Sequence, residues 1–587
     1  MPTLGDVVSS LLPNGSRGKA DAPTWEHCPI WPPDVFAVAA TLVDRSGCYA
    51  EPSLAISRDK GEREEKRARA VANRKLGQQW YKQLDSILPD AVSSEWRVLW
   101  NHRSNEICVN AGEGTAWKRA ALNLLAIADE ACMGAGYFPD DEEAFLPILV
   151  ARAYLRIENG GSAFNLPESL CLRVPREVAC VLPKSLTPEV GCNLRSLSHH
   201  LALLPGCGSV RPQWNLSAPP VVSGGQASHP EHSPDHGLNL LLIPFPYVVE
   251  GKDFIVTRPP EEHENGDRID GYFSLTQKWL ENIDGTKIRN EEFNEFIANL
   301  IREAQKEVSA IHGIVFPETS LTHDYLIDLA RYLETRFPQL EMLVGGVLRK
   351  TDASTRNEAV IIRLEKGSIK SFVQSKHHRW RLEDSQLSRY NIGHRLDPRH
   401  AWWEQIDVHD RTIIFSLSRH QAVMSALVCE DLARFDPVIP VLNAVGPNLI
   451  FALLMDGPQT KDRWSGRYAT VLAEDPGSAV LTLTCLGMVR RSYRPGQTEK
   501  HVVGLWKSRG DDALELTLPT GAHALVLALG VQESNQRTLD LRQGKASGVA
   551  VEYRLAGLKS VRIADPPGWL ERAELDPRSI QRRKRKI

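Results

Sequence analysis

The feature that most constrains the fold of this chain is an alternation of strand-like and helix-like segments that begins near residue 238. A continuous apolar run at 238–249 is typical of a buried strand. An amphipathic helix follows at 290–311, where apolar residues recur at intervals of three and four. A short strand at 313–316, a helix at 321–337 and a strand at 340–348 continue the pattern. This alternation predicts an α/β domain in which helices cover a sheet.

Three of the predicted strands end on residues whose side chains can take part in catalysis. The strand "GIVF" is followed by Pro317 and Glu318, the hairpin at 358–376 ends on Lys376, and the segment 411–429 ends on Cys429. In α/β folds the functional crevice lies just beyond the carboxyl ends of strands. The three segments therefore predict a carboxylate, an ammonium and a thiol at one site.

Each of these residues also has a simpler interpretation. Glu318 could be an acidic charge at the start of the following helix, and Lys376 could belong to a solvated basic strand edge. Cys429 alone could be a small buried hydrophobic residue. However, Glu430 and Asp431 follow Cys429 directly and would disfavour its thiolate. A nucleophilic Cys429 would need a base and a cation from elsewhere in the chain, which Glu318 and Lys376 could supply.

The same segments resemble the nitrilase superfamily of carbon–nitrogen hydrolases. The resemblance is carried by "VFPETSL" (315–321), "NEAVIIRLEKGSIKSFVQSKHH" (357–378), "LVCEDLARFDP" (427–437) and "RYATVLAEDPGSAVLTLTC" (467–485). It covers about 238–545 and implies a four-layer α-β-β-α sandwich. It also implies these roles: Glu318 as general base, Lys376 as catalytic lysine and oxyanion donor, Cys429 as nucleophile, the backbone of Glu430 as a second oxyanion donor, and His378 at the usual histidine position.

The sequence departs from the family pattern after the lysine. Members of the family usually carry a second glutamate about eight residues further on, and here Glu383 and Asp384 compete for that place. The interval from Lys376 to Cys429 is also long, which indicates an insertion at 390–406. This insertion is rich in aromatic and basic residues. We expect it to shape the mouth of the pocket.

The rest of the chain is predicted as three further parts. Residues 1–204 form a mostly helical N-terminal domain, with helices at 59–88, 116–136 and 142–161 and a strand and turn at 37–50. Residues 205–237 form a linker rich in Pro, Gly, Ser and His, and residues 546–587 form a C-terminal extension with the basic run 582–586. The pair His199 and His200 is expected in a partly exposed helix. The segments 110–120 and 137–143 indicate helix starts rather than a phosphate loop or a polymerase motif.

Composition narrows the class of protein. The hydrophobic share of 42% and the net charge of −3 are those of a globular protein without a general affinity for nucleic acid. None of the ten cysteines forms C-x-x-C, and no secretory signal or membrane-length apolar run is present. We therefore expect a cytoplasmic protein with reduced thiols and no membrane contact. No metal or organic cofactor is implied.

Two functions from different classes follow from these observations. The first is a hydrolase of non-peptide C–N bonds that forms an acyl-enzyme on Cys429 with a small amide or nitrile substrate and, by resemblance, assembles as a homo-oligomer. The second is a non-enzymatic or regulated effector or scaffold of a bacterial anti-phage system, which works with a reverse transcriptase or another partner. A protein or nucleic-acid partner would then bind through the N-terminal domain or the basic tail.

Overall fold

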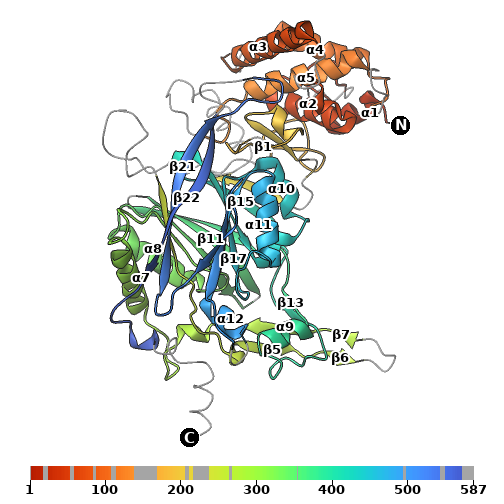
Figure 1. The fold of residues 1–587 in the computed structure, drawn as a ribbon. Coiled ribbons are helices and arrows are strands. Elements are labelled where there is room, and N and C mark those ends of the chain that lie inside the picture. The colour runs from red at the N-terminus through yellow and green to blue at the C-terminus, as the bar shows by residue number, and fades with distance from the viewer. Residues whose placement is uncertain are drawn as a thin grey trace.

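Two seven-stranded sheets form the centre of the C-terminal part in the computed structural model of the chain (Figure 1). The structure describes residues 2–17, 24–52, 59–82, 88–107, 114–137, 168–188, 190–204, 206, 210–215, 237–262, 268–352, 354–365, 367–493, 497–542 and 549–570. The first sheet has the strand order β12 (Ser368–Ser375), β11 (Thr355–Glu365), β10 (Met342–Lys350), β9 (Gly313–Val315), β4 (Leu238–Leu242), β21 (Ala524–Asn535) and β22 (Val549–Val561). The second has the order β20 (Leu514–Thr517), β19 (Val502–Lys507), β18 (Ala479–Thr484), β17 (Leu449–Leu454), β16 (Val423–Val428), β15 (Thr412–Leu417) and β3 (Arg211–Asn215).

The two sheets face each other and carry helices on their outer sides. Strand β11 packs against β16 and strand β12 against β15, so the sheets share one apolar interior. The first sheet is covered by α7 (Asn290–Ala304) and α8 (His323–Glu334), and the second by α10 (Val438–Val445) and α11 (Trp464–Glu474). Figure 1 shows these pairs on opposite sides of the sheets. The predicted α-β-β-α sandwich is therefore the observed fold.

A smaller layer closes one end of the sandwich. It consists of β13 (Arg381–Leu382), β14 (Trp402–Glu404), β8 (Gly271–Leu275) and β5 (Phe254–Arg258), the helices α9 (Asp384–Arg389) and α12 (Leu486–Arg491), the 3-10 turns η5 (Gly251–Asp253) and η6 (Lys278–Leu280), and the pair β6 (Glu261–Glu262) and β7 (Arg268–Ile269). The predicted insertion 390–406 lies here. Its strand β14 pairs in parallel with β8.

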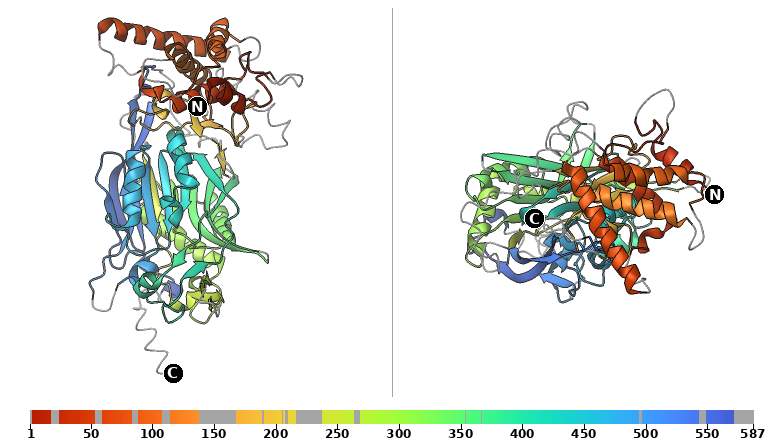
Figure 2. Two further views of the ribbon diagram at one scale, coloured as in Figure 1. Left: turned by 90° about the vertical axis from the view of Figure 1, so that its right-hand side faces the viewer. Right: turned by 90° about the horizontal axis from the view of Figure 1, so that it is seen from above.

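The N-terminal part is mostly helical within its described residues, as predicted. It contains α1 (Leu4–Leu11), α2 (Pro32–Ser46), α3 (Lys60–Lys82), α4 (Asp90–Asn101), α5 (Thr115–Glu130), and the strand pair β1 (Cys180–Pro183) and β2 (Leu201–Leu204), together with the turns η1 (Cys48–Ala50) and η3 (Arg195–Leu197). Figure 2 shows these helices gathered at the end of the sandwich opposite to the smaller layer. The predicted helix 142–161 and most of the segment 137–143 lie outside the described residues.

Two local predictions in this part are wrong. The segment 37–50 was expected as a strand and turn, but it continues α2, which starts on two prolines and ends at Gly47 with φ 68°. Because this apolar run is buried on every side, its pattern does not separate strand from helix. His199 and His200 lie in no helix; they are buried at 5% exposure each, just before β2.

The boundaries of the sandwich also differ from the prediction. The expected linker 205–237 contains β3, which pairs in parallel with β15 at the edge of the second sheet. The expected extension 546–587 contains β22, which pairs with β21 over its full length. The basic run 582–586 lies outside the described residues. No helix in the described ranges is long and apolar enough to cross a membrane.

Candidate active site

The carboxyl ends of β9, β12 and β16 deliver the three predicted residues to one buried place. Glu318 follows β9 by three residues, Lys376 follows β12 directly, and Cys429 follows β16 directly. The three side chains are 2%, 0% and 5% exposed. Base, cation and thiol are thus withdrawn from bulk water, where their mutual electrostatic effects are strongest.

The loop that carries Glu318 depends on a close approach to strand β10. The Phe316 amide donates to the Val344 carbonyl and the Gly346 amide donates to the Pro317 carbonyl, so the loop lies directly over the strand. A Cβ at Gly346 would lie 2.4 Å from the Glu318 Cα. Only glycine permits this spacing. Thr319, which follows the base, adopts the left-handed φ of 51°.

The Lys376 ammonium is held between two carboxylates. Its Nζ donates to Glu318 Oε1 at 2.9 Å and to Glu404 Oε2 at 2.7 Å. The Asn357 side-chain amide donates to the same two carboxylates, at 2.8 Å to Glu318 Oε1 and at 2.9 Å to Glu404 Oε1. The Trp380 amide adds a hydrogen bond of 3.1 Å to Glu404 Oε2. This network fixes the lysine and the base with respect to each other.

One oxygen of the base remains available. Glu318 Oε2 is buried and has no hydrogen-bond partner among the described residues. Burial raises the pKa of Glu318; Lys376 opposes this effect and Glu404 adds to it, and the pKa lies above the ordinary value. Burial lowers the pKa of Lys376, but Glu318 and Glu404 raise it more, so the ammonium keeps its proton. A carboxylate with a raised pKa and a free oxygen is suited to accept a proton.

Cys429 stands at a sharp turn between strand and 3-10 turn. Strand β16 is buried over all six residues and passes into η8 (Cys429–Ala433), and Cys429 itself has φ 49°. A non-glycine residue in this region costs on the order of 1–3 kcal/mol, and such strain gathers at functional sites. Burial raises the pKa of the thiol well above its ordinary value; Glu318 raises it further and Lys376 lowers it. The charges of both predicted partners therefore reach the sulfur.

Asp431 ties the Cys429 turn to the segment that carries Lys376. Its fully buried carboxylate accepts from the His377 amide at 3.0 and 3.2 Å and contacts His378 Nδ1 at 3.0 Å. His378, at the predicted histidine position, therefore contacts Asp431, which also accepts from the backbone amide next to Lys376. The Asp431 carboxylate therefore faces the backbone next to Lys376. It has a structural partner of its own.

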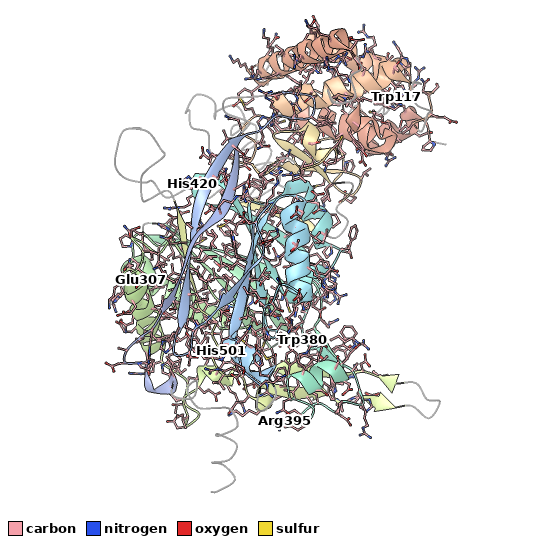
Figure 3. The ribbon with its side chains drawn as sticks, in the orientation of Figure 1. Trp117, Glu307, Trp380, Arg395, His420 and His501 are labelled. Atoms are coloured by element: carbon pink, nitrogen blue, oxygen red, sulfur yellow. The ribbon has the colours of Figure 1, made fainter. Side chains whose placement is uncertain are left out.

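Cys429 lines a cavity of about 310 Å³. Aromatic side chains and charged groups line it: Trp380, Gln386, Arg389, Tyr390, Glu430, Ala433, Arg434, Met455, Asp456, Arg463, Trp464 and Tyr468. Figure 3 shows Trp380 toward the end of the sandwich that lies away from the N-terminal helices. Asp456 accepts hydrogen bonds from the Tyr390 hydroxyl and, at 2.7 and 2.8 Å, from Arg463. Tyr390 comes from the insertion 390–406, so this insertion does contribute to the pocket.

The second carboxylate beside Lys376 is Glu404, not Glu383 or Asp384. Glu383 and Asp384 are exposed at the start of α9, and Glu383 pairs with Arg381 instead. Glu404 comes from β14 within the predicted insertion, which moves the acid away from the expected spacing. The sequence signal for it was a lone acid in the apolar run "AWWEQI". Glu430 lines the cavity and pairs with Arg434 at 2.8 Å.

Comparisons with known proteins show which solved structures this chain is similar to. No protein-family model matches the sequence, and no curated protein matches it. Among solved structures, a CN-hydrolase superfamily protein from Xanthomonas campestris with an arsenic adduct in its active site is similar over 49% of this chain and 91% of its own, with 10% identity and a TM-score of 0.24. Nit3 from Saccharomyces cerevisiae, a member of branch 10 of the nitrilase superfamily, is similar over 55% of this chain and 90% of its own, with 11% identity and a TM-score of 0.27.

A third similar structure is the glutamine-dependent NAD(+) synthetase from Cytophaga hutchinsonii. It matches over 50% of this chain and 42% of its own length, with 10% identity and a TM-score of 0.24. The similar structures include nitrilase-superfamily proteins. At these low identities and TM-scores, the roles of Glu318, Lys376 and Cys429 rest on the contacts within this chain.

Proposed function

We propose that this chain is a hydrolase of non-peptide carbon–nitrogen bonds in which Cys429 forms an acyl-enzyme, Glu318 is the general base and Lys376 stabilises the oxyanion. The observation that carries the proposal is the buried contact of 2.9 Å between Lys376 and Glu318, whose charges shift the pKa of the Cys429 thiol in opposite directions, while Cys429 itself lines a cavity. Buried charges of this kind are costly unless they are paired. Their concentration beside a strained thiol favours catalysis over packing.

The first half of the reaction forms a thioester. Glu318 Oε2 accepts the Sγ proton of Cys429 as the sulfur bonds to the amide carbon. The carbonyl electrons move to the oxygen, which accepts hydrogen bonds from Lys376 Nζ and the Glu430 amide. The C–N bond then breaks, and the nitrogen leaves as ammonia or an amine with the proton held by Glu318.

The second half returns the enzyme to its resting state. A water molecule gives a proton to Glu318 and attacks the thioester carbon. The C–S bond breaks, the carboxylic acid is released, and the thiolate recovers its proton from Glu318. Because the resting thiol is protonated, its reactivity depends on transfer of its proton to Glu318.

The test is the rate at which iodoacetamide alkylates Cys429, followed by peptide mapping. Because Cys192 is exposed, the experiment uses a Cys192→Ser background, and buried Cys485 reports any unfolding. Glu318→Gln is expected to slow alkylation by roughly 10²-fold or more, since a positioned base contributes about 10²–10⁴-fold. Lys376→Ala should also slow it. The matched control is Glu383→Gln, an exposed acid of the same type, which should change nothing.

A second measurement tests the chemistry itself. The protein is incubated with a mixture of small amides and nitriles, and its intact mass is recorded for a covalent adduct that is absent from Cys429→Ala. A Cys429 that alkylates no faster than Cys485, with no adduct from any mixture, would contradict the hydrolase and support the non-enzymatic scaffold instead.

A further inference from the structure

A second cavity of the sandwich is lined by a surplus of positive charge. It has a volume of about 920 Å³ and lies between the turn η6, the start of α7, the start of α8 and the end of β10. Its charged lining consists of Lys278, Glu281, Lys287, Arg289, His323, Asp324, Arg349 and Lys350. Five of these side chains are permanently cationic and two are anionic. The surplus contrasts with the net charge of −3 on the whole chain.

Much of this positive charge lacks a carboxylate partner. Arg289 lies 4.0 Å from Glu292. Within the described part of the chain, however, neither Lys278 nor Lys287 forms a salt bridge, and Lys350 Nζ donates only to the Leu275 carbonyl at 3.0 Å. Burial alone lowers the pKa of Lys350, with no opposing effect of a nearby acid. By contrast, Arg349 is paired with the buried Glu358. The three lysines Lys278, Lys287 and Lys350 thus leave the lining with more positive than negative charge despite its two acids, and this surplus attracts an anion from solution.

The lining favours phosphate groups over nucleobases. Of its two aromatic rings, Tyr325 is 8% exposed and donates its hydroxyl to the Ile288 carbonyl, so it offers no face for stacking, and His323 lies beside the Asp324 carboxylate at 3.9 Å. Sequence-tolerant binding of single-stranded nucleic acid depends on such faces. Lysine ammonium groups, in contrast, bind phosphate as compact point charges. The cavity is closed on one side by α8, whose first amide groups add positive character.

We propose that this cavity binds a small ligand that carries two or more phosphate groups. The same cavity lies directly behind the loop of the general base. Gln277, which lines it, donates from Nε2 to the carbonyls of Thr319 and Leu321 at 2.8 and 2.7 Å. The neighbouring Trp279 donates to the Ser320 carbonyl at 2.9 Å. A ligand held here therefore stabilises the loop that carries Glu318.

The test uses inorganic tripolyphosphate as the probe and the full chain as the protein. Calorimetric titration should give saturable binding, and the thermal midpoint should rise with the probe concentration, because a ligand of the native state stabilises it. The variant Lys278→Gln/Lys287→Gln removes two unpaired cations and should weaken binding by at least tenfold. The matched control is Arg302→Gln/Lys306→Gln, which removes two exposed charges at and just beyond the end of α7 and should bind as the parent does.

Two outcomes would overturn the proposal. One is equal binding by both double variants, which would mean that the probe responds to the charge of the whole molecule. The other is tighter binding of a single-stranded oligonucleotide than of tripolyphosphate, with the same loss in Lys278→Gln/Lys287→Gln, which would assign the cavity to nucleic acid. Neither result depends on the activity of Cys429, so the hydrolase and this site are tested separately.

Discussion

At the scale of single residues, Asn357 and Glu404 set the proton affinity of the base in opposite directions. The side-chain amide of Asn357 donates hydrogen bonds to both carboxylates that flank Lys376. Its hydrogen bond lowers the pKa of Glu318, whereas the negative charge of Glu404 raises it. Burial is the larger effect and raises the pKa further. Two residues that neighbour Lys376 therefore adjust the pKa of Glu318 in opposite directions.

This balance predicts opposite pH shifts for two variants. The base must be ionised to take the thiol proton, so the alkylation rate of Cys429 rises as the pH passes upward through the pKa of Glu318. Asn357→Leu removes a stabilising donor, and its rate curve should move to higher pH. Glu404→Gln removes a repelling charge, and its curve should move to lower pH. Shifts in the same direction for both variants would show that Glu318 does not govern the rate.

The buried positions of Glu318, Lys376 and Cys429 at strand ends could be predicted from sequence because each follows an apolar strand and carries a local motif. Glu404 could not, because its position depends on how an insertion folds back across the sandwich and pairs β14 with β8. The spacing of residues in the sequence does not indicate that β14 pairs with β8. Asp431 illustrates the same limit: its proximity to Cys429 suggested a repelling charge, but its carboxylate faces the His377 amide.

At the scale of elements, the strands with clear apolar runs and the helices with a regular period begin within about three residues of their predicted starts, but β4 ends at Leu242 and α7 at Ala304, well before the predicted 249 and 311. The failures share a cause. Strand β3 contains a proline and no apolar period, and it exists because β15 offers it an open edge. Strand β22 has exposed or half-buried residues along much of its length and is held by its partner β21. Tertiary pairing decides such strands, and local pattern does not.

Strand β10 carries a prediction about how the base is placed. Gly346→Ala would put a Cβ 2.4 Å from both the Glu318 Cα and the Pro317 carbonyl oxygen, which are backbone atoms that cannot rotate away. We expect a loss of about 2–3 kcal/mol in the free energy of unfolding and a large fall in Cys429 alkylation, since overpacking costs about 1–3 kcal/mol and here displaces the base.

The neighbouring glycine of the same strand provides the control for this prediction. A Cβ at Gly345 would lie 3.2 Å from the end of the Leu326 side chain, which can adjust. Gly345→Ala should therefore cost less and leave alkylation close to that of the parent. Equal effects of the two alanines, measured by urea denaturation and by alkylation rate, would contradict the account of the Glu318 loop given above.

At the scale of the whole molecule, one buried arginine connects the sandwich to the N-terminal helices. Arg542 follows β21, whose hairpin with β22 extends to the N-terminal part in Figures 1 and 2. Its guanidinium donates to Asp129 and Glu130 of α5 at 2.9 Å each and to the Leu197 carbonyl. The three partners are separated from it by more than 300 residues of sequence. The two parts of the chain therefore share a buried ionic junction.

The junction predicts that the N-terminal helices and the sandwich unfold together in the parent and separately without it. Arg542→Met leaves Asp129 and Glu130 buried without their cation, and removal of one partner of a buried pair costs about 3–5 kcal/mol. The control is Lys559→Met. Lys559 lies on the same hairpin and forms an exposed ion pair with Glu307, so its loss should lower the free energy of unfolding by less than about 1 kcal/mol. Urea denaturation followed by fluorescence should show one transition for the parent and for the control, and an earlier, separate transition for Arg542→Met. A single unshifted transition in all three proteins would mean that the apolar contacts between the two parts hold them together without this arginine.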